Sequence, residues 1–334
     1  MTAQTIKSAG RRAAAALFAL SALALAAAGL LAGPSAAEAA GEEINFGIIS
    51  TESSQNLKPV WEPFIKDLNA KTGLNVKPFF ATDYAGIIEG MRFNKVQLAW
   101  YGSKAAIEAV DRAHGEVFMQ TVSHDGSEGY YSHIIAHRDS PLNSIEDMFA
   151  RAKDLNFGNG DPNSTSGFLV PGYYVFALNS KDAKTIFKRT LISNHEGNAL
   201  AVANGQLDVA TCNNESLARL EVTFPDKRAL IKVIWTSPLI PSDPLVRRVD
   251  LDPAVKKKID DFLLSYGATP QEAEVLKSLQ WKGFKVSTNA QLNSIRQLEL
   301  FKEKRVLEDA GALNDAQQAR LKEIDAQLAE LSLQ

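Results

Sequence analysis

The sequence predicts an α/β fold in which strands and helices form layered domains. Apolar runs of strand length alternate with segments whose apolar residues recur at helical spacing, as Val60, Trp61 and Phe64 do. The 334 residues are enough for two domains, or for one domain with a tail. From residue 291 the composition turns to Leu, Glu, Lys, Gln and Ala, which predicts a helical arm at the end.

Residues 1–39 have the pattern of a cleavable signal peptide. A basic start precedes an apolar run over residues 13–32, and Ala37-Glu38-Ala39 matches the small-x-small pattern that signal peptidase cuts. An uncleaved membrane anchor is the alternative, because the run could just span a bilayer. The Ala-rich run and the well-formed cut site favour cleavage after Ala39 or Ala40. We therefore expect a periplasmic protein.

Composition limits the partners of the exported chain. Cys212 is the one cysteine, so no internal disulfide can form. The leader carries three basic residues and one acid, and its removal takes the net charge from −3 to −5. This mild acidity argues against nucleic acid as a partner. It also means that local dipoles, rather than the overall field, would have to hold an anionic ligand.

The first domain is expected over residues 40–130 and 240–290. Its predicted strands are 44–50, 76–80, 98–101 and 117–122, and its predicted helices are 57–71, 84–93, 103–113, 253–266 and 270–279. Asp83 is a candidate N-cap for the second of these helices.

The second domain is expected over residues 131–239. Strands at 132–136 and 231–235 mark the two crossings between domains. Between them we expect helices at 145–152, 165–178, 183–190 and 195–203, with strands at 155–157 and 207–211.

The arm, residues 291–334, contains apolar residues at 3-4-3 spacing: Leu321, Ile324, Leu328 and Leu331. This repeat could form a homodimer through the C-terminal helix. It could equally pack the helix on its own domain, because it is shorter than the three or four heptads that a coiled coil needs.

The most informative segment is Gly-Asn-Gly-Asp-Pro-Asn-Ser-Thr-Ser-Gly, residues 158–167. A loop ends in Ser164, Thr165 and Ser166, and a helix is expected to follow. The first turn of a helix has unpaired backbone N–H groups and a positive partial charge, so these residues could wrap a tetrahedral oxyanion without Lys or Arg. The alternative is an ordinary N-cap, but three adjacent hydroxyls exceed what a cap needs.

Three tyrosines stand at the ends of predicted elements: Tyr84, Tyr101 and Tyr130. A phenol can donate a hydrogen bond to an anion while its ring excludes water. For each tyrosine taken alone, packing in the core is the simpler explanation.

Two acids also follow strand ends, Glu215 and Asp243. If both face one cleft, they would hold a cation, and a ligand with an anionic head and an ammonium tail would be recognised at both ends. Surface carboxylates are common, so this is a weaker inference. His195 starts a predicted helix and could also point inward.

The chain offers no convincing catalytic constellation. It lacks a P-loop, a Ser-His-Asp order, an HExxH motif and paired cysteines. A secreted phosphoryl-transfer enzyme would need a metal cluster or an activated nucleophile. We therefore expect a binding protein without catalytic residues, metal or cofactor.

Several segments carry a family resemblance. They are Asn45 to Ser53, Asp83 to Lys95, Ala99-Trp100-Tyr101-Gly102, and the long run from Phe157 to Tyr174. In these the chain resembles the phosphonate-binding periplasmic component of phosphonate ABC transporters, over about residues 44–310. It departs from the family pattern at His124 and Cys212.

The resemblance implies a two-lobed periplasmic-binding-protein fold of the second type, with two crossings between lobes. It implies that Ser164, Thr165 and Ser166 hold a phosphonate group. It further implies that Tyr84 and Tyr130 line the pocket.

By the same resemblance, His195, Glu215 and Asp243 receive the amino end of 2-aminoethylphosphonate. The expected partners are a small phosphonate and the transporter permease. A receptor for phosphite, phosphate or simple alkylphosphonates is the alternative, although it needs no pair of acids.

Overall fold

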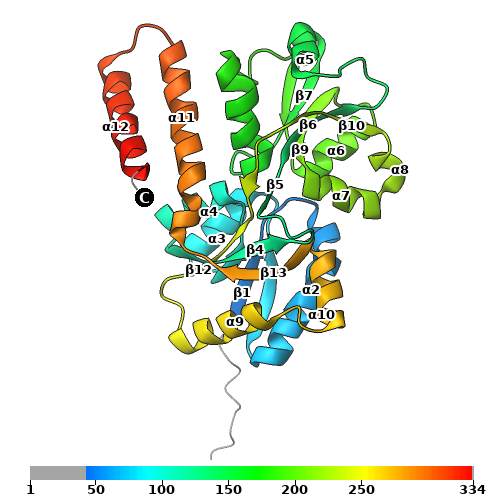
Figure 1. The fold of residues 1–334 in the computed structure, drawn as a ribbon, viewed down its shortest axis with the longest axis vertical. Coiled ribbons are helices and arrows are strands. Elements are labelled where there is room, and N and C mark those ends of the chain that lie inside the picture. Colours follow the sequence, from blue (N-terminus) through cyan, green and yellow to red (C-terminus); the bar gives the residue numbers. More distant parts are fainter. Residues whose placement is uncertain (1–42, 333–334) are drawn as a thin grey trace, which may run out of the picture. The chain divides into compact units, whose positions relative to one another are not determined.

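The structure, a computed structural model, describes residues 43–332 (Figure 1). The predicted signal peptide lies outside the described residues. Two larger sheets and one short two-stranded sheet organise this part of the chain. Within it, no helix has both the length and the hydropathy needed to cross a membrane.

The first sheet has six strands in the order β13-β4-β12-β3-β1-β2. β1 is parallel to β2 and β3, whereas β12 and β13 run antiparallel to their neighbours. The strands are β1 (Glu43–Ile48), β2 (Asn75–Phe80), β3 (Leu98–Trp100), β4 (Gly115–Ser123), β12 (Pro244–Arg248) and β13 (Trp281–Val286).

Helices cover both faces of the first sheet and bury a separate core on each. One core contains Ile87 and Ile107, and the other contains Trp61 and Phe64. The helices are α2 (Ser54–Thr72), α3 (Tyr84–Arg92), α4 (Ser103–Arg112), α9 (Pro253–Ser265) and α10 (Pro270–Ser278). The apolar periodicity predicted all five of these helices.

The second sheet has five strands in the order β10-β6-β9-β7-β8. They are β6 (Ser132–His137), β7 (Asn156–Asn159), β8 (Arg189–Ile192), β9 (Val209–Asn213) and β10 (Ile231–Thr236). Its helices are α5 (Ile145–Arg151), α6 (His195–Ala203), α7 (Asn214–Thr223) and α8 (Pro225–Arg228), with a 3-10 turn, η1 (Ala152–Asp154). This half also has two cores, one around Phe157 and one around Leu217.

The chain passes between the two sheets through a short antiparallel ladder. β5 (Gly129–Tyr130) pairs with β11 (Ile240–Pro241). A Cβ at Gly129 would lie 2.1 Å from the carbonyl oxygen of Ile240, so the close approach of the two segments requires glycine here.

Two predicted helices differ in the structure. The helix expected at 165–178 is wound more widely, as η2 (Thr165–Leu169) and η3 (Gly172–Phe176), both π-helical, followed by the 3-10 turn η4 (Ala177–Asn179). Pro171 interrupts the backbone ladder between them.

The prediction of a helix at 183–190 is wrong. Turns precede β8 there, and the apolar spacing instead places Phe187 on the second sheet, where its ring stacks on Phe157 with centroids 4.5 Å apart.

The C-terminal arm forms a helical hairpin of α11 (Asn293–Asp309) and α12 (Asp315–Leu331), entered through η5 (Asn289–Leu292). Ile324 of α12 is fully buried, and ion pairs Arg320–Glu303 (2.7 Å) and Lys304–Asp325 (2.5 Å) join the two helices. The leucine repeat therefore packs α12 against α11 within the arm, whereas the second explanation had expected it to pack on the domain.

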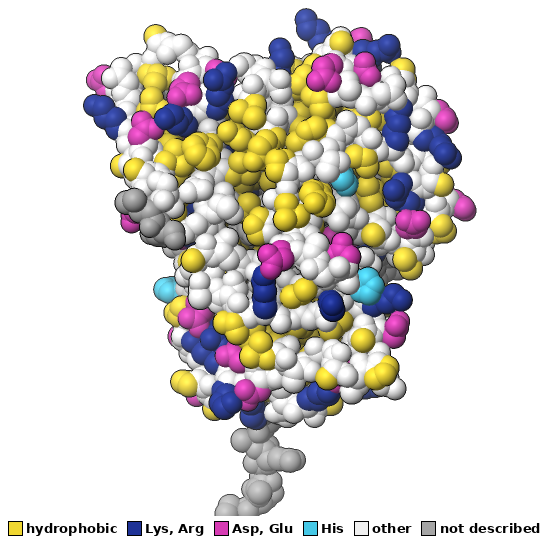
Figure 2. Space-filling model, viewed as in Figure 1, with side chains coloured by type: hydrophobic (Ala, Val, Ile, Leu, Met, Phe, Trp, Pro, Cys, Tyr) yellow, Lys and Arg dark blue, Asp and Glu magenta, His cyan; other side chains and the backbone are white. Residues whose placement is uncertain are grey.

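α11 also contacts elements of both sheets. Arg296 pairs with Asp111 of α4, and Glu299 pairs with Lys104 at 2.6 Å. Further along the helix, Lys302 lies over the ring of Phe168 at 4.5 Å. On the face that Figure 2 shows, basic and acidic side chains are interspersed, which agrees with the small net charge.

Candidate functional site

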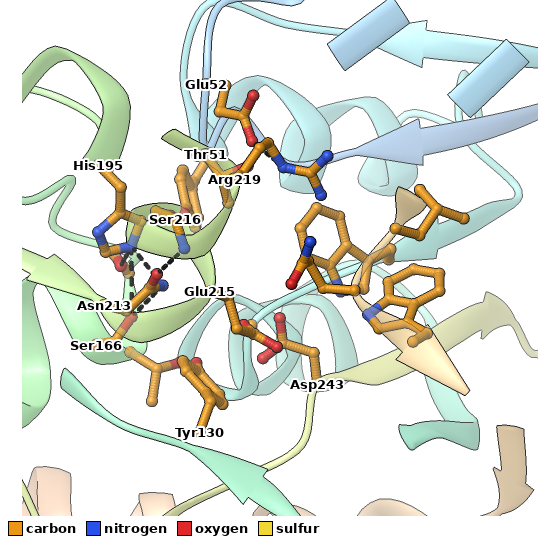
Figure 3. Close-up of a pocket in the computed structure, with 18 residues that line it drawn as sticks. Thr51, Glu52, Tyr130, Ser166, His195, Asn213, Glu215, Ser216, Arg219 and Asp243 are labelled. Atoms are coloured by element: carbon orange, nitrogen blue, oxygen red, sulfur yellow. Dashed lines mark hydrogen bonds and ion pairs between the residues drawn. The ribbon is translucent and has the colours of Figure 1, made fainter. Parts of the chain in front are cut away.

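A cavity lies between the two sheets and is lined from both sides (Figure 3). Its volume of about 40 Å³ is room for a few water molecules or for one small ligand. The first sheet's half and the crossing contribute Thr51, Glu52, Tyr84, Trp100, Gly102, Tyr130, Asp243, Leu279, Gln280 and Trp281. The second sheet's half contributes Ser164, Thr165, Ser166, His195, Asn213, Glu215, Ser216 and Arg219.

At one end of the cavity stand the three hydroxyls that the sequence singled out. Ser164 is the N-cap of η2, and Thr165 and Ser166 form its first turn. All three are buried. Gly160 makes this turn possible, because a Cβ there would lie 2.5 Å from the backbone of Gly167.

We call the three hydroxyl residues Ser164, Thr165 and Ser166 the nest. Their hydrogen bonds determine which groups they can present to a ligand. Each hydroxyl oxygen already accepts one N–H group: Ser164 from the Gly167 amide at 2.9 Å, Thr165 from the Lys104 amide at 3.0 Å, and Ser166 from Asn213 Nδ2 at 3.2 Å. Each hydroxyl proton is therefore directed elsewhere. Such an arrangement can offer three O–H donors to an oxyanion in the cavity.

Asn213 belongs to this end, and the sequence analysis missed it. Its side-chain oxygen accepts the Ser216 amide at 2.7 Å, which caps α7. The side-chain N–H groups are thereby turned toward the nest. An Asn at a strand end just before a helix is the signal that could have found it.

His195, at the start of α6, is almost fully buried beside the nest. Its Nε2 atom lies 3.3 Å from Ser166 Oγ, and 3.4 Å from both Ser164 Oγ and Asn213 Nδ2. Burial lowers the pKa of the imidazole to about 4, so the ring is neutral. The resemblance implied that His195 stands with Glu215 and Asp243 at the amino end, whereas the structure places it beside the hydroxyls. There the ring adds polarity without adding charge.

Toward the other end, Glu215 and Asp243 face the same cavity from different halves of the structure (Figure 3). Glu215 lies in the first turn of α7, and Asp243 immediately precedes β12. Burial raises the pKa of Glu215 to about 7, with Arg219 opposing the shift. Burial, reinforced by the charge of Glu215, raises the pKa of Asp243 well above its ordinary value. Asp243 Oδ1 is buried without a hydrogen-bond partner among the described residues.

Two of the three predicted tyrosines line the cavity, and one does not. Tyr84 and Tyr130 are buried in its wall, and burial raises the pKa of both phenols, so both keep their protons. Tyr101 lies in the core, where its hydroxyl donates to the carbonyl of Ile87 at 3.0 Å. We therefore leave Tyr101 out of the candidate site.

Polar contacts between the two halves surround the cavity, and sequence reasoning did not find them. Arg219 pairs with Glu52 at 2.5 Å and donates to the Ser278 carbonyl at 3.0 Å. Burial raises the pKa of Glu52 to about 7, against the attraction of Arg219. Glu196 accepts the Ser53 amide at 3.0 Å. These contacts join residues that are far apart in the sequence, so no local sequence pattern predicts them.

No group of three or more His, Cys, Asp or Glu suited to a metal occurs in the described part of the chain. Cys212 is fully buried behind the nest, with its thiol 3.8 Å from the His195 carbonyl oxygen. Burial raises the pKa of this thiol to about 12, so it stays protonated and unreactive.

The chain is similar to known proteins in both sequence and structure. Residues 46–292 match the family described as "ABC transporter, phosphonate, periplasmic substrate-binding protein". The phosphonates-binding periplasmic protein of Escherichia coli (strain K12) is 56% identical over 302 residues, covering 90% of this chain and 89% of that protein. A phosphate-import protein of Mycolicibacterium smegmatis is 31% identical, covering 74% of this chain and 77% of that protein.

A solved structure gives the same result for the fold. The crystal structure of a binding-protein component of an ABC phosphonate transporter from Pseudomonas aeruginosa matches with a TM-score of 0.85 and 59% identity, covering 87% of this chain and 96% of that one.

Proposed function

The chain belongs to the family of periplasmic substrate-binding proteins of phosphonate ABC transporters, and from this premise we propose that it captures phosphonates that carry an ammonium group, such as 2-aminoethylphosphonate. The family is a substrate-binding component of transporters and not a family of enzymes. Its partners are a small phosphonate and an ABC transporter permease.

The observation that carries the proposal is the chemical contrast between the two ends of one small cavity. Uncharged donors from Ser164, Thr165 and Ser166 suit the oxygens of a phosphonate group. At the other end, Glu215 and Asp243 suit an ammonium group. A short linker between the two charges would let one ligand engage both ends.

Closure of two lobes around the ligand accounts for how such a cavity is reached. We take the lobes to be residues 40–130 with 240–290, and residues 131–239, with the arm at 291–334. A ligand that contacts both lobes stabilises the closed form by its extra affinity for that form. The permease would then recognise the closed form.

The family is periplasmic, and residues 1–39 are proposed to be the signal peptide that exports the chain. N-terminal sequencing of the protein isolated from the periplasm would test this. A mature chain that begins near residue 40 is expected, whereas a chain that retains residue 1 would contradict cleavage.

A second candidate is a receptor for simple alkylphosphonates, phosphite or phosphate. The raised pKa of Glu215 and of Asp243 favours it, because protonated acids would not repel a ligand that lacks an ammonium group. The two candidates differ in what the acid pair does when it is ionised.

A panel of ligands distinguishes them. The midpoint of thermal unfolding should rise most with 2-aminoethylphosphonate, less with methylphosphonate, and least with phosphate, because a ligand that binds only the folded state stabilises it. Calorimetry would supply the affinities. A panel in which methylphosphonate or phosphate stabilises the protein more than 2-aminoethylphosphonate would favour the second candidate.

A further inference from the structure

The end of the cavity that contains the nest also contains one side chain that can accept a proton, whereas its neighbours there serve as hydrogen-bond donors. The Ser164, Thr165 and Ser166 hydroxyls and the Asn213 amide present hydrogen-bond donors there. Among the described residues that line the cavity, His195 is the one whose nitrogen can act as a base. In the empty cavity the Ser166 hydroxyl, 3.3 Å away, can donate to this nitrogen. Once that hydroxyl turns to an oxyanion, the nitrogen is free to accept a proton that the ligand itself carries.

The orientation of Asn213 assigns the role of the ring nitrogen. The Ser216 amide fixes the side-chain oxygen of Asn213 at 2.7 Å, which leaves Nδ2 to face Ser166 and the ring. An amide N–H can only donate. His195 Nε2, 3.4 Å from that amide nitrogen, is therefore placed as an acceptor, with the ring proton on Nδ1.

The other ring nitrogen does not fix the tautomer. His195 Nδ1 is buried and has no hydrogen-bond partner among the described residues. In most proteins the partner of one imidazole nitrogen decides where the ring proton lies. Here the groups that meet Nε2 decide it: the Asn213 amide in the empty cavity, and the ligand once it is bound.

Among residues 43–332, no second base faces the ring at this end of the cavity. η2 presents the Ser164 and Ser166 hydroxyls, β9 presents Asn213 and the Cys212 thiol, and the ring carbon Cε1 lies against Gly167. Two phenols, two carboxyls and the Glu52–Arg219 pair line the rest of the cavity: Tyr84, Tyr130, Glu215, Asp243, Glu52 and Arg219. The Glu196 carboxylate turns away to Ser53.

We propose that His195 accepts the proton of a singly ionised phosphonate, so that the site takes R–PO₃H⁻ as well as R–PO₃²⁻. This inference rests on the proposed function of the cavity. The P–OH group donates to Nε2 in place of the long contact from Asn213, which keeps its bond to Ser166. Whether the proton stays on oxygen or moves to nitrogen, it enters the cavity with the ligand and none is released to solvent.

The number of protons exchanged on binding tests the proposal directly. Titration calorimetry with methylphosphonate, in several buffers of different ionisation enthalpy, gives that number at a pH at least one unit below the second pKa of the ligand. A site that takes only the dianion must release about one proton per complex there. A site that takes the monoanion releases about none.

Two substitutions of one residue sharpen the test. His195→Gln keeps an acceptor oxygen near the position of Nε2, whereas His195→Phe keeps the bulk and removes the acceptor. Each is measured in a Glu215→Gln, Asp243→Asn background, so that the carboxyls contribute no protons. His124→Phe, at a histidine outside the cavity, is the matched control.

We expect about zero protons released by the native histidine, by the Gln variant and by the control, and about one by the Phe variant. The Phe variant should also lose about tenfold in affinity for each pH unit below the second pKa of the ligand. Release of about one proton with His195 in place would overturn the inference while leaving phosphonate binding intact. Absence of methylphosphonate binding at every pH would instead count against the proposed function.

Discussion

The two ends of the cavity hold opposite charges by different physical means. The nest around Ser166 is built from neutral hydroxyls, each of whose oxygens already accepts one amide N–H, so its geometry is set before a ligand arrives. The end around Glu215 and Asp243 relies on carboxyls that burial makes costly to ionise. A phosphonate group therefore meets dipoles that are already in place. An ammonium group, by contrast, binds well only after the carboxyls of Glu215 and Asp243 have lost their protons.

Affinity and selectivity should therefore reside at different ends of the cavity. Fixed donors bind any phosphonate and hardly change with pH, because no hydroxyl titrates in the ordinary range. The carboxyl pair separates aminophosphonates from alkylphosphonates, and its effect should depend on pH. Five measurements would test this contrast.

The largest effect is expected from removing donors. Ser164→Ala combined with Ser166→Ala should weaken 2-aminoethylphosphonate and methylphosphonate alike by about 3 kcal/mol or more, or at least about 100-fold, because each hydrogen bond to a charged group is worth about 1.5–3 kcal/mol. Calorimetry with both ligands measures this. Ser265→Ala, on the exposed face of α9, is the control. A loss confined to one ligand would contradict a shared anion site.

The next effect should be selective. Glu215→Gln with Asp243→Asn should weaken 2-aminoethylphosphonate by about 2 kcal/mol or more, about 30-fold, because the buried ammonium group loses its counter-charges. Methylphosphonate should bind as well as before or better. Equal losses for both ligands would remove the ammonium-binding role of the pair.

The third effect is a pH dependence. Burial holds the pKa of Glu215 at about 7 and raises that of Asp243, so below neutral pH an ammonium group must displace protons from the empty site. Affinity for 2-aminoethylphosphonate should therefore rise by up to about tenfold per unit from about pH 5 to about pH 7. Affinity for this ligand that stayed flat over this range would show that the pair is ionised throughout.

The same shift has a consequence for stability, with a definite sign. The folded protein holds a proton on Glu215 between the ordinary glutamate pKa of 4.5 and about 7, where the unfolded chain has lost it. The free energy of unfolding of the empty protein should therefore fall as pH rises through this window. Denaturant unfolding of the native chain and of the Glu215→Gln, Asp243→Asn variant, compared at pH 5 and pH 8, isolates the contribution of the pair.

The smallest effect should come from outside the cavity. Glu196 bonds to the Ser53 amide across the two halves without lining the cavity. Glu196→Gln should weaken both ligands by about 1 kcal/mol, about fivefold, because the closed form loses one contact. Affinities from calorimetry and the radius of gyration from solution scattering would measure it. A change of selectivity between the ligands would mean that Glu196 acts on the pocket itself.

The sequence predicted most of the elements because each carries a local signal. Apolar periodicity found α2 and the helices around the first sheet, and the run of hydroxyls found the nest. β12 and β13 were missed because they pair with β4, which lies more than 100 residues earlier. α7 was missed because only Leu217 and Leu220 on it are buried, too few to mark a periodic face.

The part of the candidate site that is formed by consecutive residues, such as Ser164 to Ser166, could be predicted from the sequence. The part that is formed by residues distant in the sequence could not. The Glu52–Arg219 pair joins residues 52 and 219, which nothing local connects. Tyr101 had the right local setting, at a strand end before Gly102, yet its side chain turns into the core. Only packing decides on which side of a strand a tyrosine points.

The buried position of Cys212 has a practical consequence. Because this thiol is fully shielded and firmly protonated, it should not compete for maleimide dyes in the native protein. A cysteine introduced at the rim of the cavity would then take up a fluorophore at a single known place. Movements of the two halves could be followed by emission without first replacing any native residue.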